Sequence, residues 1–175
     1  AIGSGIGIGF LGQGAMGAVY KGKDHAIERL VALKTIRAGY GGTPAEAEDL
    51  RERLVREAKA AGKLSHPNIV TIYDVGADGD LRYIAMEYLE GYTLEQVVRQ
   101  KVQLNYRIAA KILMQVCAAL DYAHKAGIVH RDIKADNIMI NSKNQIKVMD
   151  FGLAKLRGVT RITKEQSTLG TLGYM

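Results

Sequence analysis

Several features that mark particular classes of protein are missing from this chain of 175 residues. Its single cysteine, Cys117, cannot form an internal disulfide, so nothing points to an oxidising compartment. Cys117 lies in an apolar helical pattern, where we expect a buried structural thiol rather than a nucleophile. No apolar run reaches the roughly 18 residues that a membrane-spanning helix needs. Residues 1–11 are apolar but too short for a signal peptide, and no basic residue precedes them. These absences favour a cytoplasmic location, with any membrane anchor of the parent protein outside this segment.

Blocks of like charge, Pro/Ser-rich linkers and internal repeats are also absent. The chain has 24 basic and 18 acidic residues, a net charge of +6, but the basic residues are scattered. We therefore expect no nucleic-acid partner, whereas small anions such as nucleotides suit this charge. The composition is 47% hydrophobic and 24% charged, which is enough to bury a core in one domain or two small lobes.

Hydrophobic periodicity predicts a strand-rich first half that contains one helix, followed by a helical second half. The predicted strands cover residues 6–10, 18–23, 30–36, 69–75 and 81–88, with a small hairpin at 138–149. The predicted helices cover residues 43–64, a short stretch from 93, and 105–125. Residues 87–91 form the natural joint between the halves, and a cleft between two lobes is a common ligand site.

Helix ends are indicated by capping residues. Thr43 precedes Pro44, which suits a first helical turn, and Thr93 with Gln96 has the pattern of a capping box. Gly127 follows the last apolar position of the long helix and is expected to end it.

Residues 12–17, Gly-Gln-Gly-Ala-Met-Gly, match a pattern in which backbone amides approach phosphates closely. A Walker-type loop would end in Gly-Lys-Ser/Thr, which is absent, and a dinucleotide-binding fold needs a helix directly after the glycines. Residues 18–21 instead predict a strand, which favours a strand–turn–strand flap over phosphates. An ordinary hairpin turn remains compatible with this loop taken alone.

Lys34 lies in Val-Ala-Leu-Lys-Thr-Ile, a mostly apolar strand pattern. Glu57 falls inside the apolar stripe of the next helix, at positions 50, 54, 57, 61 and 64. A buried carboxylate calls for a cation, because desolvating an unpaired charge costs several kcal/mol. Lys34 is the best upstream candidate, and the pair would hold the lysine ready to bind phosphates. The alternatives are a solvent-facing lysine on an edge strand and a glutamate that reaches water.

The strongest tract is residues 128–139, with Asp132, Lys134 and Asn137, followed by Asp150-Phe-Gly. Phosphoryl transfer needs an acceptor for the proton of the attacking hydroxyl, oxygen ligands for Mg²⁺ and cations that offset developing charge. Asp132 fits the first role, Asn137 and Asp150 the second, and Lys134 the third. Two polar turns bordering a hairpin would explain one of these residues but not the whole set in this order.

In this order and spacing, the motifs make the chain resemble the eukaryotic-type protein kinase family, closest in style to the bacterial serine/threonine kinases. The resemblance covers nearly all of residues 11–175. It implies an α+β, protein-kinase-like two-lobe fold, with a complete N-lobe of an antiparallel sheet plus one helix at residues 1–88. Residues 89–175 would be the hinge and only the first part of a helical C-lobe, through most of the activation segment.

The resemblance implies roles for individual residues. Asp132 would be the catalytic base, assisted by Lys134. Lys34 would contact the α- and β-phosphates of ATP and pair with Glu57.

Metal and nucleotide ligands are implied in the same way. Asn137 and Asp150 would bind Mg²⁺, with Mn²⁺ as the alternative ion. Met86 resembles the gatekeeper, residues 87–89 resemble the hinge whose backbone meets adenine, and Met149 would line the adenine pocket. The residues expected to bind ATP are Leu11, Gly12, Gln13, Gly14, Ala15, Met16, Gly17, Ala18, Val19, Ala32, Lys34, Met86, Glu87, Leu89 and Met139.

Regulation by phosphorylation is a further implication. Arg131 and Lys155 would form a basic pocket that suits a phosphorylated residue. The resemblance implies protein substrates with Ser or Thr acceptors, together with autophosphorylation and dimerisation; hydroxyls of a flexible loop are the alternative. The candidate phosphorylation sites, which precede a Gly-Thr pair expected to face the substrate, are Ser167, Thr168, Thr163 and Thr160.

The sequence departs from the family at its end. Kinase domains usually continue with Ala-Pro-Glu and several helices, so we expect a truncated chain. Two classes of function follow: an ATP-dependent serine/threonine protein kinase, and a nucleotide-binding regulatory module without phosphotransfer. The intact Asp132, Lys34 and metal ligands favour the first. A small-molecule kinase is disfavoured by Lys134 and by the Gly-Thr pair.

Overall fold

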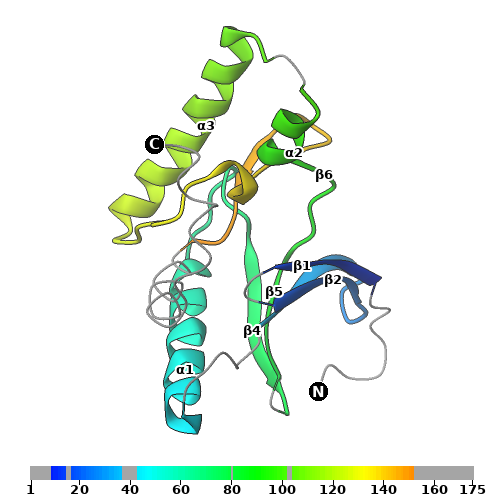
Figure 1. The fold of residues 1–175 in the computed structure, drawn as a ribbon, viewed down its shortest axis with the longest axis vertical. Coiled ribbons are helices and arrows are strands. Elements are labelled where there is room, and N and C mark those ends of the chain that lie inside the picture. Colours follow the sequence, from blue (N-terminus) through cyan, green and yellow to red (C-terminus); the bar gives the residue numbers. More distant parts are fainter. Residues whose placement is uncertain (1–8, 15–16, 37–42, 80, 102–103, 152–175) are drawn as a thin grey trace.

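The larger sheet of the protein has five strands in the order β1-β2-β3-β5-β4, and each neighbouring pair is antiparallel. The computed structural model describes residues 9–14, 17–36, 43–79, 81–101 and 104–151. Figure 1 shows helix α1 (Pro44–Ala61) alongside β4 and β5, which confirms the predicted antiparallel sheet with one helix. The strands of this sheet are β1 (Gly9–Gly14), β2 (Gly17–Asp24), β3 (Arg29–Ile36), β4 (Ile72–Asp78) and β5 (Leu81–Glu87).

Strand β3 is central in this sheet, between β2 and β5. Its apolar residues Val31, Ala32 and Leu33 are buried, as expected of a strand covered on both faces. Lys34 lies opposite Val19 of β2 and Ile84 of β5. The alternative of a lysine on an edge strand is therefore wrong.

Helix α1 packs on the sheet through small side chains. Ala58 is fully buried in a cluster with Ala32, Val70, Ile84 and Met86. Small residues let the helix backbone come close to the strands, so the buried face of α1 lies near the sheet. α1 ends at Ala61, three residues before the predicted end, and the buried Leu64 follows it in a turn.

A second, three-stranded sheet has the order β6-β7-β8. Its middle strand, β7 (Ile138–Asn141), pairs with β6 (Gly91–Thr93) and with β8 (Ile146–Val148). β7 and β8 form the predicted hairpin, whereas β6 was not predicted because three residues carry too little periodicity. A 3₁₀ turn, η1 (Ala135–Asn137), leads into β7.

The two helices of the second half begin at capping residues. Thr93 and Gln96 form the predicted capping box at the start of α2 (Leu94–Arg99). Asn105 caps α3 (Tyr106–Lys125), and its side-chain oxygen accepts a hydrogen bond from the backbone N–H of Ile108 at 3.0 Å. Gly127 has a positive φ of 75° just beyond α3, as expected of a helix-ending glycine.

Helix α3 buries one face against the second sheet. Its buried residues Ile112, Val116, Ala119 and Ala123 join a core with Ile138, Ile146, Val148 and Phe151. Cys117 is exposed, so its predicted burial is wrong. One residue corresponds to a rotation of about 100° around the helix, which carries Cys117 away from the buried face marked by Val116.

Residues 68–70 join the two sheets. The backbone N–H of Val148 donates to the carbonyl oxygen of Asn68 at 2.8 Å, and that of Val70 donates to the carbonyl oxygen of Val148 at 3.0 Å. Because this segment pairs with β8, β4 begins only at Ile72 rather than at the predicted residue 69.

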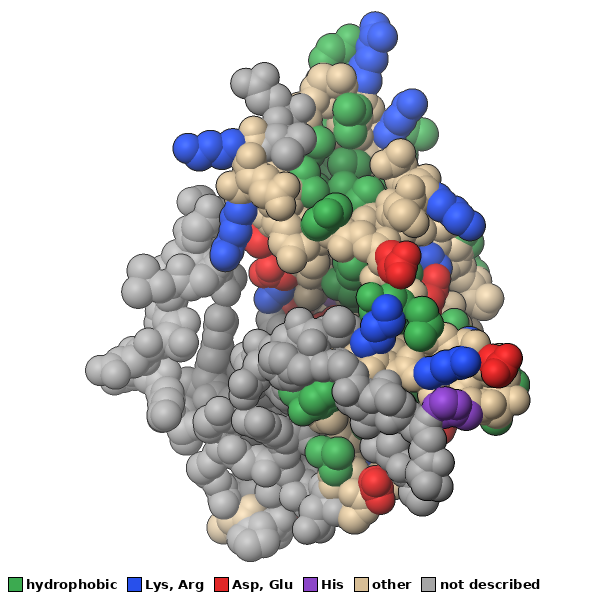
Figure 2. All heavy atoms as spheres, turned by 90° about the vertical axis from the view of Figure 1, so that its right-hand side faces the viewer, with side chains coloured by type: hydrophobic (Ala, Val, Ile, Leu, Met, Phe, Trp, Pro, Cys, Tyr) green, Lys and Arg blue, Asp and Glu red, His purple; other side chains and the backbone are tan. Residues whose placement is uncertain are grey.

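The surface agrees with the scattered charge of the sequence. Figure 2 shows basic side chains spread over one face of the molecule rather than gathered into a single patch. Among the residues that the structure describes, no helix has the length and apolar character required to cross a membrane.

Candidate active site

The glycine loop lies in a β-hairpin. Gly12, Gln13 and Gly14 of β1 pair with Val19, Ala18 and Gly17 of β2, and Ala15 and Met16 between them lie outside the described residues. A strand follows the glycines, which excludes the dinucleotide-binding arrangement with a helix at this point. Leu11 belongs to β1, and its neighbour Gly12 follows a shift in the β1–β2 register.

Thr35 connects this hairpin to β3, which sequence reasoning missed. Its buried hydroxyl oxygen accepts from the N–H of Ala18 and donates to the carbonyl oxygen of Ala18, both at 3.1 Å. Thr35 follows Lys34 directly, so the hairpin and the lysine are tied to the same short stretch of β3.

Lys34 forms a direct ion pair with Asp150. Its Nζ lies 2.7 Å from Oδ1 and 2.6 Å from Oδ2 of Asp150, and the two side chains are 14% and 21% exposed. The two residues are 116 positions apart in sequence. The fold therefore brings the predicted phosphate-binding lysine and a predicted metal ligand into one site.

Glu57 differs from expectation, because its partner is Arg131 and not Lys34. Arg131 Nη1 lies 3.8 Å from Glu57 Oε1, while Lys34 is held by both oxygens of Asp150. Contact with both oxygens of Asp150 satisfies the lysine, and Glu57 pairs instead with Arg131, which precedes Asp132. Among the described residues, Glu57 Oε2 is buried without a hydrogen-bond partner.

Asp132 is surrounded by donors from its own loop. Asn137 Nδ2 donates to the Asp132 carbonyl oxygen at 2.7 Å and to its Oδ2 at 3.2 Å. Lys134 Nζ lies 3.3 Å from the same Oδ2. Arg131, just before the aspartate, has a positive φ of 68°, and such strained backbone is concentrated at functional sites. The loop therefore holds a carboxylate, a lysine and an amide in one small cluster.

His130 holds this loop against the segment that carries Asp150. It is 1% exposed; its Nε2 lies 2.7 Å from the carbonyl oxygen of Met149, and its Nδ1 accepts from the N–H of Asp132 at 3.3 Å. This pattern places the proton of a neutral ring on Nε2. Burial lowers the pKa of His130, although the Met149 hydrogen bond and the carboxylates of Asp150 and Asp132 oppose the shift. The neutral ring is thus favoured.

Pairing of β7 with β8 brings the backbone of Asn137 beside Met149, the residue that precedes Asp150. A strand pair between Asn137 and Asp150 was predicted. The N–H of Met149 donates to the carbonyl oxygen of Asn137 at 2.9 Å, directly before Asp150. Asp150 has a positive φ of 62°, and Asn137 is 4% exposed. A carboxylate and an amide oxygen are the hard ligands that Mg²⁺ prefers, so the donor types of these residues fit that ion.

Most of the predicted adenine-side residues form one apolar cluster. Ala32 and Met86 are each 9% exposed. Met139 is half-buried on β7, opposite Thr93 and Lys147. Ala18 is buried on β2. The partly buried residues packed against the cluster of Ala32 and Met86 include Val19, Tyr88, Leu89 and Met149.

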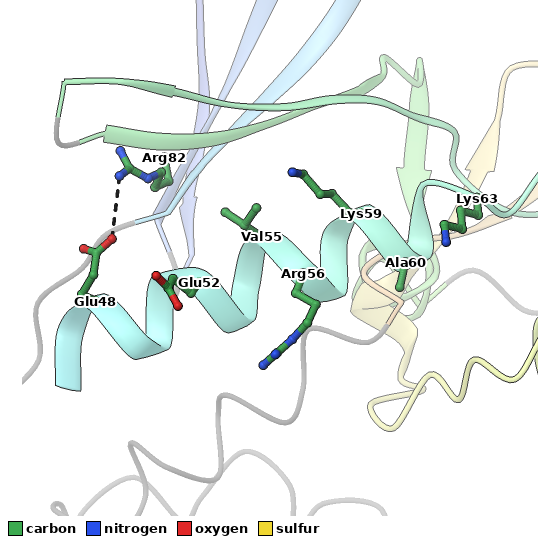
Figure 3. Close-up of a pocket in the computed structure, with 8 residues that line it drawn as sticks. All are labelled: Glu48, Glu52, Val55, Arg56, Lys59, Ala60, Lys63 and Arg82. Carbon is green, nitrogen blue, oxygen red and sulfur yellow. Dashed lines mark ion pairs between the residues drawn. The ribbon is translucent and has the colours of Figure 1, made fainter. Parts of the chain in front are cut away.

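A separate groove runs along α1. It has a volume of about 600 Å³ and lies between α1 and Arg82 of β5 (Figure 3). Arg82 Nη2 pairs there with Glu48 Oε1 at 3.9 Å. None of the predicted catalytic or ATP-binding residues lines this groove, so the proximity of Lys34, Asp132 and Asp150, and not cavity size, locates the candidate site. Its lining consists of Glu48, Glu52, Val55, Arg56, Lys59, Ala60, Lys63 and Arg82.

The predicted phosphorylation sites Thr160, Thr163, Ser167 and Thr168 lie outside the described residues, as does Lys155 of the predicted basic pocket.

Comparisons with known proteins identify the family of the chain. The family model described as the protein kinase domain matches residues 7–175. The chain is 42% identical over 165 residues to the serine/threonine-protein kinase PrkC of Bacillus subtilis, covering 94% of this chain and 25% of that protein. It is 39% identical over 170 residues to the serine/threonine-protein kinase PknB of Mycobacterium leprae, covering 94% of this chain and 27% of that protein.

The chain therefore belongs to the protein kinase domain family, with the kinase-like α+β fold that its sequence predicts. Its similar proteins are bacterial serine/threonine kinases. The chain spans about a quarter of the length of these curated relatives.

Proposed function

We propose that the protein containing this chain transfers the γ-phosphate of ATP to serine or threonine hydroxyls of protein substrates. The observation that carries the proposal is the cluster in which Lys34 contacts Asp150 while Asp132 contacts Lys134 and Asn137. An acceptor carboxylate, two cations and two oxygen ligands are the set that phosphoryl transfer requires.

In this proposal Asp132 accepts the proton of the attacking hydroxyl as its oxygen bonds to the γ-phosphorus. The bond from that phosphorus to the oxygen that bridges it to the β-phosphate breaks, and ADP leaves. Asn137 orients the Asp132 carboxylate through its 3.2 Å hydrogen bond, and Lys134 offsets charge on the transferred group. Mg²⁺, or Mn²⁺ as the alternative, would neutralise phosphate charge when held by Asn137 and Asp150.

We further propose that Lys34 exchanges Asp150 for Glu57 during the catalytic cycle. Lys34 contacts both oxygens of Asp150, so it competes with a metal ion for this carboxylate. Glu57 has one buried oxygen without a partner among the described residues, so it can accept a cation without losing a contact there. Arg131, now paired with Glu57 at 3.8 Å, is half-exposed and would be released toward a phosphorylated residue.

Several finer assignments belong to the same proposal. The glycine hairpin covers the phosphates, and the cluster around Ala32 and Met86 receives adenine. Residues 1–88 act as the N-lobe and 89–175 as the hinge and partial C-lobe. The use of ATP together with the single cysteine supports a cytoplasmic location. Dimerisation would bring two copies together for autophosphorylation at Ser167, Thr168 or Thr163, for which phosphopeptide mapping of residues 160–171 in active protein is the measurement.

The substitution Asp132→Asn in the complete protein tests the assigned base. We expect kcat for transfer of radiolabelled phosphate to a basic protein to fall by about 10²–10⁴-fold, because an amide cannot accept the proton. The affinity for ADP should stay within about twofold, because Asp132 does not bind the nucleotide in this proposal. Equal transfer by the wild type and the variant would reject Asp132 as the base.

The alternative function is a nucleotide-binding regulatory module without phosphotransfer. It would bind ADP through the same cluster, but radiolabel would not reach any protein, with or without Asp132→Asn. The preserved Asp132–Lys134 pair disfavours this alternative, because a binding module does not need a proton acceptor.

A further inference from the structure

Lys147 is a buried cation that the proposed chemistry does not use. It lies in the middle of β8, three residues before Asp150, and it is 7% exposed. Buried lysines are rare unless they are paired, because the ammonium group loses its hydration. A position inside a three-residue apolar strand therefore calls for a specific partner.

That partner is Glu87, the last residue of β5. Lys147 Nζ lies 2.8 Å from Glu87 Oε2 and also donates to the carbonyl oxygen of Ile69 at 3.3 Å. The same carboxylate oxygen accepts from the N–H of Thr71 at 3.3 Å. In addition, the backbone N–H of Glu87 donates to the carbonyl oxygen of Thr71 at 2.8 Å. Glu87 is thus held by its backbone and by its side chain.

The ion pair connects two parts of the proposed active site. Glu87 follows Met86 and begins the hinge whose backbone is proposed to meet adenine, and it lies opposite Val31 on β3. Lys147 lies on the strand that leads to Asp150 and pairs there with Met139. The side chains of the pair are 9% and 25% exposed, so water screens this contact less than it screens a surface ion pair.

We propose that Lys147 is a positioning residue for adenine recognition: its ion pair with Glu87 fixes the hinge backbone against the segment 69–71. This inference rests on the proposed function, because it assigns the hinge to adenine. Without the lysine, the Glu87 carboxylate is left partly buried beside the carbonyl oxygen of Ile69. It then turns toward water and takes the adjoining backbone with it.

The test replaces Lys147 with methionine, which keeps an unbranched side chain but removes the charge, in the complete protein. We expect the Kd for ADP and the KM for ATP to rise about tenfold, while kcat at saturating ATP changes by less than about threefold. Inhibition by tripolyphosphate, which has no adenine, should change by less than about twofold. The matched control is Lys143→Met, an exposed lysine in the turn between β7 and β8, for which we expect no change.

Unchanged ADP affinity in Lys147→Met would overturn the inference. Equal losses for ADP and tripolyphosphate would also overturn it, because they indicate general damage to the site.

Glu87→Gln tests the same ion pair if Lys147→Met does not fold, because glutamine keeps the side-chain volume. We expect ADP affinity to fall several-fold, and Lys147→Met added to Glu87→Gln to cost less than about twofold more. Fully additive losses, or none in Glu87→Gln, would overturn the pairing. A wild-type protein that binds no ADP would instead reject the proposed function, and the inference with it.

Discussion

His130 joins the segment that carries Asp132 to the segment that carries Asp150. Its ring lies between the N–H of Asp132 and the carbonyl oxygen of Met149, and it packs edge-on against Phe151 with the ring centroids 4.6 Å apart. One neutral imidazole thus fixes the position of the proposed base relative to Asp150. A charged ring would place an N–H on Nδ1 against the N–H of Asp132, so protonation removes one of these two contacts.

Stability should therefore depend on pH through His130. Its pKa is lowered by burial below the ordinary value of 6.5, so the unfolded chain binds the proton more readily than the folded one. The stability present above about pH 6.5 should be lost as the pH falls below it. We expect the drop in Tm between about pH 7.5 and about pH 5.5 to be smaller in His130→Gln than in the wild type.

The control for this experiment is His25→Gln, which changes an exposed histidine in the turn after β2. It should leave the pH dependence of Tm as it is in the wild type. Identical pH dependence in His130→Gln and the wild type would contradict the role of His130.

At the scale of elements, the short strand β6 shows how closely the backbones of β6 and β7 approach each other. A Cβ atom on Gly91 would clash with the carbonyl oxygen of Ile140 on β7. Gly91 pairs with Asn141, and the N–H of Ser142 donates to the carbonyl oxygen of Glu90 at 3.0 Å. Only glycine fits this position without separating β6 from β7, which continues from the turn containing Asn137.

The substitution Gly91→Ala should consequently separate these strands. We expect a loss of about 3 kcal/mol in the free energy of unfolding and faster hydrogen exchange at the Ser142 amide. Gly79→Ala is the control, because Gly79 has a positive φ of 55° but no atom within 4 Å of an added Cβ. It should cost about 1 kcal/mol without changing exchange at Ser142. Unchanged exchange in Gly91→Ala would show that the strands tolerate the methyl group.

At the scale of the whole molecule, the stretch around Asn68 fastens the five-stranded sheet to the helical part. The buried Asn68 amide donates to Gln115 Oε1 on α3 and to the carbonyl oxygen of Ile146 on β8, both at 2.8 Å. Gln115 Oε1 also accepts from the N–H of Ile146 at 3.0 Å. The Asn68 side chain, from the segment that precedes β4, thus contacts both α3 and β8.

Replacement of Asn68 should loosen this junction. Asn68→Ala removes the side-chain donor to the carbonyl oxygen of Ile146 and one of the two donors to Gln115 Oε1. We expect it to lower the free energy of unfolding by about 2 kcal/mol in urea titrations. Gln115→Ala should cost less on its own, and the double variant should cost less than the two losses combined because they share one hydrogen bond. Additive losses would show that the two side chains act independently.

Local signals in the sequence were enough for much of the fold. The Thr93–Gln96 capping box, the glycine that ends α3 and the apolar face with Ile112 and Val116 each depend on residues within one or two helical turns, and the structure confirms them. The strand after the glycine loop was likewise readable from neighbouring residues. The predicted burial of Cys117 was wrong because neighbouring positions on a helix point in different directions, and Cys117 follows the buried Val116.

Partners distant in sequence were harder to predict. The motifs predicted Lys34, Glu57, Asp132, Asn137 and Asp150 as one functional set, and they paired Lys34 with Glu57, which is not the contact in the structure. Lys34 with Asp150 and Glu57 with Arg131 became visible only in three dimensions. The Lys147–Glu87 pair had no sequence signal, since a lysine between two apolar residues also suits an exposed strand face.

The sequence by itself determined the family, the order of the longer strands and helices and the residue types of the proposed catalytic set, because these depend on spacing and local periodicity. Only the tertiary structure decided which carboxylate each cation meets, that residues 68–70 bind β8 instead of extending β4, and that the buried Lys147 pairs with Glu87. Those outcomes depend on distances between segments far apart in the chain, where packing and desolvation select one partner among several of suitable charge.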